Sequence, residues 1–139
     1  METAQKEEFT IVKRVIDEKY NLIDANGKLL LDEWFNWIDY FHDGLARVQR
    51  VSDNKYNLIT ADGKLLLDEW YEWVDYFHDG LAIVRREDYL NNFIDKNGKL
   101  LSNEWFSWVN DFKDGLAVGQ RTNGEYFKID KQGKIVVCK

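Results

Sequence analysis

Short runs rich in apolar and β-branched residues, separated by clusters of Gly, Asn and Asp, make up most of the chain. One example is Leu45–Val51, which Ser52-Asp53-Asn54 separates from Lys55–Ile59. Runs of this length bounded by such residues are typical of β-strands joined by hairpin turns. The sequence has no Pro, so Gly, Asn and Asp must make the turns. The pattern predicts an all-β chain.

The runs recur as an internal repeat. Residues 19–50 align with residues 55–86 at an offset of 36 residues and differ at only seven positions. A third copy follows at a spacing of 35 residues, a fourth begins near Phe127, and Thr10–Arg14 aligns with Ala82–Arg86. We therefore expect about three and a half repeats in one domain over residues 9–139, after a disordered tail of residues 1–8. The expected units are 9–18 (partial), 19–54, 55–89, 90–124 and 125–139 (partial).

Each unit contains a residue pair that favours a tight turn. These pairs are Asn26-Gly27, Asp62-Gly63, Asn97-Gly98 and Gln132-Gly133. Asn-Gly and Asp-Gly suit type I′ hairpins, so Tyr20–Asp24 and Lys28–Leu31 are predicted to be paired strands. Asn123-Gly124 predicts a further hairpin between Leu116–Arg121 and Glu125–Ile129.

The aromatic connector from Trp34 to Asp43 is ambiguous. Trp34, Trp37, Ile38 and Phe41 have helical spacing, but the segment is short and ends in Asp-Gly. We interpret it as an irregular or short strand segment with one tight bend. A helical turn over Asp32–Trp37 is the alternative.

Short connections between successive strands favour an antiparallel meander. The predicted architecture is therefore an open, twisted array of tandem antiparallel β-meander repeats. A small closed, propeller-like ring, in which Thr10–Arg14 completes the blade begun by Tyr126–Val137, is the alternative.

The ordered motifs resemble a known family. I-D-x-x-G-K, an aromatic segment and D-G-L-A-x-V recur about every 35 residues from Thr10 to Val137, and this order is similar to that of the WG-repeat (KWG-type) proteins of bacteria and their phages. The Trp-Gly that names the family would fall at Tyr20-Asn21, Tyr56-Asn57, Asn91-Asn92 and Tyr126-Phe127, so the chain looks like a divergent subtype. The resemblance implies a β-repeat scaffold used for binding, with no assigned reaction.

Charge and hydropathy exclude several classes of partner. The net charge is −6, and no basic run exceeds Arg85-Arg86, which argues against nucleic-acid binding. No apolar stretch is long enough to span a membrane or to form a signal peptide, so we expect a cytoplasmic protein without membrane contact. The single cysteine, Cys138, is expected to be a free thiol.

Tryptophan pairs are the first candidates for a binding surface. We expect the first member of each pair, Trp34, Trp70 and Trp105, to fill the core between repeats. The second members stand as partner-binding candidates together with two tyrosines and three acids. The full candidate set is Trp37, Trp73, Trp108, Tyr40, Tyr76, Glu33, Glu69 and Glu104.

Repetition argues against catalysis, because an active site combines unlike groups at one place. Glu33, Glu69 and Glu104 recur, as do Asp43, Asp79 and Asp114, which we interpret as turn residues. His42 and His78 also recur, with Lys113 in the third copy, so we expect an exposed position without a metal. Asp24, Asp95, Asp130 and Thr60 are predicted to bond turn amides. No catalytic residue, metal or cofactor is expected.

These observations favour a non-enzymatic module that binds a protein partner through an aromatic and acidic surface. The resemblance to phage and bacterial proteins suggests an inhibitor of a host or defence factor. Carbohydrate or cell-wall binding through exposed tryptophans is an alternative. Self-association through uncapped repeat ends, giving a homo-oligomer, is another.

Overall fold

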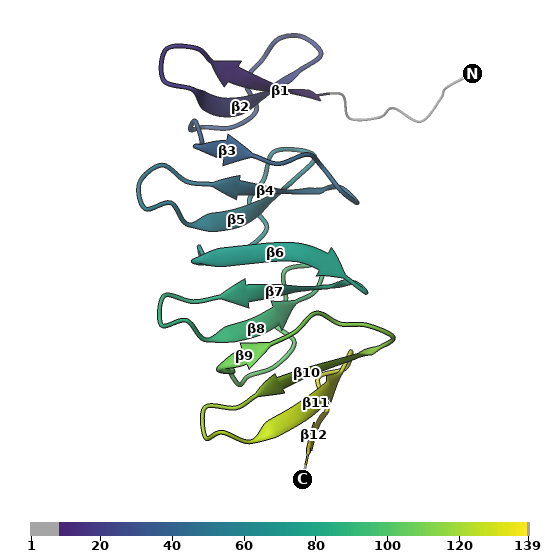
Figure 1. The fold of residues 1–139 in the computed structure, drawn as a ribbon. Coiled ribbons are helices and arrows are strands. Elements are labelled where there is room, and N and C mark those ends of the chain that lie inside the picture. The colour runs from purple at the N-terminus through teal and green to yellow at the C-terminus, as the bar shows by residue number, and fades with distance from the viewer. Residues whose placement is uncertain (1–8, 139) are drawn as a thin grey trace, which may run out of the picture. The chain divides into compact units, whose positions relative to one another are not determined.

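The computed structural model describes residues 9–138, so the tail predicted over residues 1–8 lies outside the described residues. The chain divides into two compact units, Met1–Trp70 and Tyr71–Lys139. The described residues are all-β without helices, and every strand pair is antiparallel. They form four small sheets in tandem, none of which closes on itself (Figure 1).

The first unit contains two sheets. The first pairs β1 (Phe9–Arg14) with β2 (Lys19–Asp24). The second has the order β3-β4-β5, formed by β3 (Trp37–Ile38), β4 (Leu45–Gln49) and β5 (Tyr56–Thr60). The predicted hairpin around Ser52-Asp53-Asn54 is confirmed, although β4 ends at Gln49.

The second unit repeats this plan. Its three-stranded sheet has the order β6-β7-β8 and consists of β6 (Trp73–His78), β7 (Leu81–Arg85) and β8 (Asn91–Ile94). Its four-stranded sheet has the order β12-β11-β10-β9 and consists of β9 (Trp108–Val109), β10 (Leu116–Gln120), β11 (Tyr126–Asp130) and β12 (Ile135–Val137). The predicted hairpin at Asn123-Gly124 is confirmed.

The connector forms the first strand of each three-stranded sheet and of the four-stranded one, and this strand has two residues in β3 and β9 but six in β6. In the first full repeat this strand is β3, which pairs with β4 through Trp37 and Ile38. The alternative helical turn over Asp32–Trp37 is absent from the structure. The interpretation as a short strand with a tight bend is therefore confirmed.

The predicted type I′ turns at Asn26-Gly27 and its equivalents are wrong. Gly27 has φ 82°, but Asn26 does not have a positive φ, and the Gly27 N–H donates to Asp24 O at 3.0 Å. This is the three-residue hairpin in which a type I turn is followed by a left-handed glycine. The Asp24 carboxylate stabilises it by accepting from the N–H groups of Asn26 and Lys28, both at 2.9 Å.

The type I′ turns lie instead at the Asp-Gly that ends each connector. Asp43 has φ 54° and Gly44 has φ 79°, and His42 and Leu45 exchange both backbone hydrogen bonds across the turn. Asp79 and Asp114 occupy the same conformation. Their interpretation as turn residues is confirmed.

A further correction concerns Lys28–Leu31, which is not a strand. Leu29 forms only an isolated bridge with Ile23. In the last repeat the corresponding run is a true strand, β12, paired with β11. The two runs differ in the buried residue opposite them, which is Asn21 in the first repeat and Phe127 in the last.

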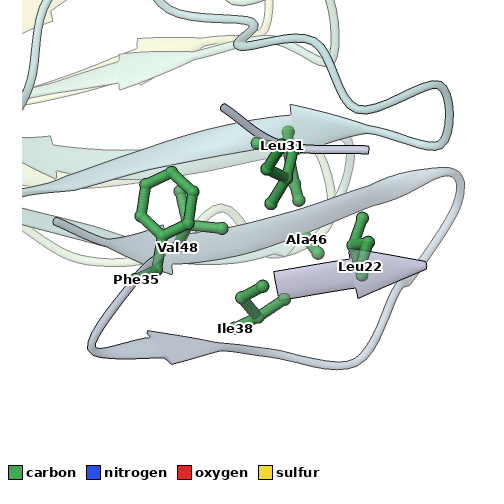
Figure 2. Packing of buried hydrophobic residues seen from close by; sticks show 7 residues of the cluster. Leu22, Leu31, Phe35, Ile38, Ala46 and Val48 are labelled. Carbon is green, nitrogen blue, oxygen red and sulfur yellow. The ribbon is translucent and has the colours of Figure 1, made fainter. Parts of the chain in front are cut away.

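The core of each unit is built from residues that alternate inward along the strands. Figure 2 shows the buried cluster of the first unit, which consists of Leu22, Leu31, Phe35, Ile38, Ala46, Val48 and Ile59. The second unit buries Leu81, Phe93, Phe106, Phe112, Ala117, Phe127 and Ile129. In the second cluster the rings of Phe106 and Phe127 lie 4.4 Å apart. Apolar burial of this kind is the main stabilising contribution to a small unit.

Candidate binding surface

A fully buried asparagine interrupts strand pairing in each of three repeats. The Asn21 Oδ1 accepts from Leu22 N at 2.6 Å and from Leu31 N at 3.2 Å. Its Nδ2 donates to Leu31 O at 3.2 Å and to Glu33 O at 3.4 Å. The amide thereby pairs backbone groups that a neighbouring strand would otherwise satisfy.

These side-chain hydrogen bonds of Asn21, which we call the asparagine clamp, create a bulge of three residues. Backbone pairing resumes between Tyr20 and Phe35, so residues 32–34 protrude from the ladder. Asn92 makes the same bonds to Ser102 O at 2.8 Å and to Glu104 O at 3.2 Å. Asn57 holds both Leu67 N, at 3.0 Å, and Leu67 O, at 3.1 Å.

Phe127 occupies the equivalent position in the last repeat and pairs regularly with Val137 of β12. A bulge of this kind therefore accompanies the asparagine. Sequence reasoning missed the clamp, although an Asn at an inward-facing strand position, where this residue type is uncommon, was the available signal.

The first tryptophan of each pair lies on this bulge beneath an arginine. Arg14 lies 4.3 Å from the Trp34 ring centroid, Arg50 lies 4.3 Å from that of Trp70, and Arg86 lies 4.4 Å from that of Trp105. All three tryptophans are half-buried. They therefore lie at the edge of the core, where Trp70 packs against the buried cluster of the first unit and stacks on Phe35 at 6.3 Å.

A carboxylate binds the edge of each of these guanidinium groups. Arg50 donates to Asp53 at 3.1 Å and 2.7 Å, and this bonding lowers the pKa of the Asp53 carboxyl to about 2. Hydrogen bonds from Arg14 and Arg86 likewise lower the pKa of Asp17 and Asp88. The carboxylates thus remain charged and hold each arginine over its ring.

The second tryptophans begin a row of side chains across their sheets. In the last sheet Trp108 is the register partner of Gln120, which is the partner of Tyr126. Directly opposed residues of antiparallel strands project to the same face, so the three side chains share one face of β9-β10-β11. The Trp108 Nε1–H donates to Gln120 Oε1 at 3.1 Å. We call these three residues the aromatic row.

The equivalent row of β3-β4-β5 is more covered. Trp37 is half-buried, its ring meets Tyr56 edge-on at 6.1 Å, and Arg47 lies 5.1 Å from its centroid. Arg47 is itself buried and binds Asp39 at 3.3 Å. Trp73 is also half-buried, and its row continues with Arg85 and Asn91.

Exposure therefore distinguishes the candidates. Trp108 is 40% exposed and Tyr126, which the sequence analysis did not single out, is 55% exposed. Tyr40 and Tyr76 are 77% and 48% exposed, shortly before the type I′ turns at Asp43 and Asp79. The structure brings Trp108 together with Gln120 and Tyr126, whereas Tyr76 belongs to β6 and Tyr40 lies outside the strands.

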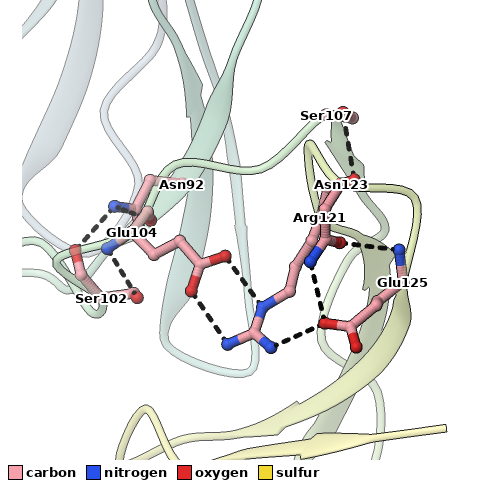
Figure 3. A network of polar contacts seen from close by, with 7 residues as sticks. All are labelled: Asn92, Ser102, Glu104, Ser107, Arg121, Asn123 and Glu125. Carbon is pink, nitrogen blue, oxygen red and sulfur yellow. Dashed lines mark hydrogen bonds and ion pairs between the residues drawn. The ribbon is translucent and has the colours of Figure 1, made fainter.

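The three predicted acids do not converge. Glu33 and Glu69 are exposed, and Glu104 is half-buried. Figure 3 shows that the Glu104 carboxylate accepts two hydrogen bonds from Arg121. Nε donates one at 2.9 Å, and the terminal nitrogen Nη2 donates the other at 3.0 Å. Arg121 also binds Glu125 at 3.2 Å. Glu104 thus serves an ion-pair network in the second unit.

The remaining polar groups behave as turn and surface residues. His42, His78 and Lys113 are exposed as expected, and His78 lies 3.5 Å from Asp111. The structurally described residues contain no group of side chains arranged to hold a metal ion. Within residues 9–138 there is also no helix with the length and hydropathy that a membrane crossing requires. Cys138 is a free, exposed thiol.

Among solved structures, the chain is similar to the computationally designed Ika8 protein, with a TM-score of 0.45 and 13% identity over 95% of this chain and 46% of that one. It is also similar to the WD40 β-propeller domain of Doa1, with a TM-score of 0.42 and 12% identity over 92% and 49% of the two chains. The C-terminal WD40 domain of Sif2 gives a TM-score of 0.43 and 14% identity over 93% and 40%. The chain thus spans less than half the length of each of these structures.

Comparison with curated proteins gives no match. The family model described as WG containing repeat matches residues 22–56 and 59–89. These segments hold the Asp-Gly turns at Asp43 and Asp79. This part of the chain is therefore similar to WG-containing repeats.

Proposed function

We propose that the chain is a non-enzymatic module that binds a protein partner through the aromatic row of Trp108, Gln120 and Tyr126. The observation that carries this proposal is the joint exposure of Trp108 and Tyr126 on one face of the β9-β10-β11 sheet. Tryptophan and tyrosine dominate the energetic centres of protein interfaces, because they add large contact areas with few rotatable bonds.

Hydrogen bonding within the row supports a preorganised contact. Gln120 accepts from the Trp108 indole and donates to Gly124 O at 3.2 Å, so the amide fixes both itself and the ring. An ordered ring loses little conformational freedom when a partner covers it. The row therefore has the properties of an interface anchor before any partner arrives.

Charge around the row favours a partner with basic residues. Asp111 is exposed shortly after Trp108 in the chain, and the net charge is −6. Complementary charge at the rim of an interface accelerates association and selects the partner. The carboxylates whose pKa is lowered lie in turns and bind arginine, threonine or asparagine, which is a structural use of their charge.

We also propose that the chain belongs to a divergent subtype of WG repeats without the Trp-Gly dipeptide. Asn21, Asn57 and Asn92 stand where its glycine would fall, and each is a buried clamp. A side chain with this role gives a physical reason for the departure, because Gly cannot supply the amide bonds.

Affinity capture from the native host tests the proposal. The full chain, the double variant Trp108→Ala/Tyr126→Ala and the control variant Tyr89→Ala are immobilised at equal density, and captured proteins are quantified by mass spectrometry. Tyr89 is an exposed tyrosine outside the row, so it controls for loss of any surface aromatic residue. We expect at least one protein to be retained by the full chain and the control and lost with the double variant.

A parallel glycan array distinguishes the carbohydrate alternative. Retention of the same proteins by all three chains would contradict the role of the row. Glycan binding that depends on Trp108 would replace a protein partner with a sugar. Folding of each variant is checked by its thermal unfolding midpoint before capture.

A further inference from the structure

A row of tryptophan, glutamine and tyrosine occurs in two sheets of the chain. In β3-β4-β5 the register partners are Trp37, Gln49 and Tyr56, and in β9-β10-β11 they are the three residues of the aromatic row. In both sheets the glutamine side chain also donates to a backbone carbonyl of the hairpin that follows it, at 3.1 and 3.2 Å. The first row therefore shows which contacts this arrangement can make.

A buried arginine covers the tryptophan of the first row. The Arg47 guanidinium carbon lies 5.1 Å from the Trp37 ring centroid, within the range of a cation–π contact. Asp39 binds the same guanidinium at 3.3 Å, and the Arg47 side chain is only 7% exposed. This face of the sheet can therefore hold a guanidinium group on its tryptophan.

The equivalent positions of the last sheet carry neither charge. The Asn110 N–H donates to Val118 O as that of Asp39 donates to Arg47 O, at 2.9 Å in both sheets, so Val118 stands in the place of Arg47 and Asn110 in that of Asp39. Val118 is half-buried and Asn110 is exposed. Within residues 9–138, no cationic side chain lies over the Trp108 ring.

The ring of Trp108 is available to a cation from a partner. Its Nε1–H donates to Gln120 Oε1 in the plane of the ring, so this bond occupies neither face, and the residue is 40% exposed. Lys128, the register partner of Val118, is exposed on the same side of the sheet, two strands away from Trp108. Neighbouring strands lie about 4.8 Å apart, so the two backbones are about 10 Å apart, a distance at which salt largely screens exposed charges.

We propose that the protein partner places an arginine side chain on the Trp108 ring, in the position that Arg47 has on the Trp37 ring. This inference rests on the proposed function and names the chemistry of the partner's contact. Tryptophan is the aromatic residue that attracts cations most strongly, and a planar guanidinium stacks on it more often than an ammonium does. The net charge of −6 favours the approach of a basic partner.

Transfer of the Arg47–Asp39 pair to the last sheet tests this inference. A displayed library of random linear peptides is selected on the full chain, on the double variant Val118→Arg/Asn110→Asp and on the control Asn110→Asp. The double variant gains one positive and one negative charge, so its net charge equals that of the full chain. The control contains the new carboxylate but leaves the Trp108 ring open.

We expect arginine to be enriched among the peptides selected by the full chain and by Asn110→Asp. It should not be enriched on the double variant, because the guanidinium of that chain then covers the Trp108 ring. Non-specific attraction of basic peptides would instead give equal enrichment on the full chain and the double variant. Equal enrichment on all three chains, or no enrichment on any, overturns the inference. Neither result affects the capture experiment with the Trp108→Ala/Tyr126→Ala variant, which tests the proposed function separately.

A double-mutant cycle with one selected peptide then identifies the contact. The peptide arginine is replaced by citrulline, which has a similar planar shape without the charge, and both peptides are titrated into the full chain and into Trp108→Leu. Exposed cation–π contacts change affinity by about twofold to fivefold, so the replacement should weaken binding by that factor in the full chain and have little effect in Trp108→Leu. An equal loss in both chains overturns the inference. Thermal midpoints check that each variant is folded, and the cycle does not depend on the double variant.

Discussion

The ring of Phe127 occupies the space beside Gly119, its cross-strand partner. A Cβ at residue 119 would lie 2.8 Å from Phe127 Cζ and 2.5 Å from Trp108 O. In the other sheets the equivalent pairs are valine and asparagine, as in Val48 with Asn57. The last repeat therefore has a small glycine opposite a large phenylalanine, where the other repeats pair two residues of intermediate size.

Gly119→Ala should destabilise the protein by about 1–3 kcal/mol, because the added carbon overlaps a backbone carbonyl that cannot move without breaking the β9–β10 pairing. Chemical denaturation of the two chains measures the change. A variant as stable as the original would mean that Phe127 and the β9 backbone can move enough to accommodate the added carbon.

Asn57→Ala should cost about 1–3 kcal/mol for each buried backbone group that loses its partner. Leu58 N, Leu67 N and Leu67 O are the groups affected, and alanine cannot replace any of these bonds. The control is Asn97→Ala at an exposed turn position, which should change stability by less than about 0.5 kcal/mol. Equal denaturation midpoints for the two variants would contradict the clamp.

The buried ion pair of Arg47 and Asp39 provides a test based on the repeat itself. Arg47→Ile introduces the residue found at the equivalent position Ile83, but it leaves the carboxylate of Asp39 without that partner, at a cost of about 3–5 kcal/mol. The double variant Arg47→Ile/Asp39→Asn should recover most of the loss, since an unpaired buried charge is no longer present. Additive losses in denaturation experiments would contradict this explanation.

The stabilisation that Asp53 provides at neutral pH should be lost in acid. Its carboxyl has a pKa of about 2 when folded, mainly through its bond to Arg50, against about 3.9 when unfolded. The stabilisation is therefore complete above about pH 4 and is lost as the pH falls towards 2.

Asp53→Asn should lower the thermal midpoint at pH 5, and the difference from the original chain should shrink as the pH falls to 2. Asp68→Asn, at an exposed position of the bulge that precedes the second connector, is the matched control and should leave the pH dependence unchanged. A constant difference between Asp53→Asn and the original chain across this range would rule out the linkage.

The strands and hairpins could be predicted because their signals are local. Apolar runs and turn residues located β4 and β5 to within two residues, and the repeat showed that the plan recurs. The type I′ turn was misplaced because Asn-Gly and Asp-Gly both permit it. At Asn26-Gly27 the Asp24 carboxylate determines the turn type. It accepts hydrogen bonds from two N–H groups of its own turn, which favours a type I turn.

Contacts between distant residues could not be predicted in the same way. Asn21 reads as an ordinary polar strand residue until Leu31 is known to lie beside it. The Arg14–Trp34 contact joins a hairpin to the next bulge, and no sequence pattern near either residue predicts this contact. Tyr126 escaped notice because its exposure depends on pairing across β10 and β11.

Calorimetric titration of the captured protein into the full chain, Trp108→Ala and Tyr89→Ala tests the central claim most directly. Removal of an interface anchor costs about 2 kcal/mol or more, so Trp108→Ala should weaken binding by at least about thirtyfold, while Tyr89→Ala should bind like the full chain. Equal affinity for all three chains would contradict the assignment of the aromatic row as the binding surface.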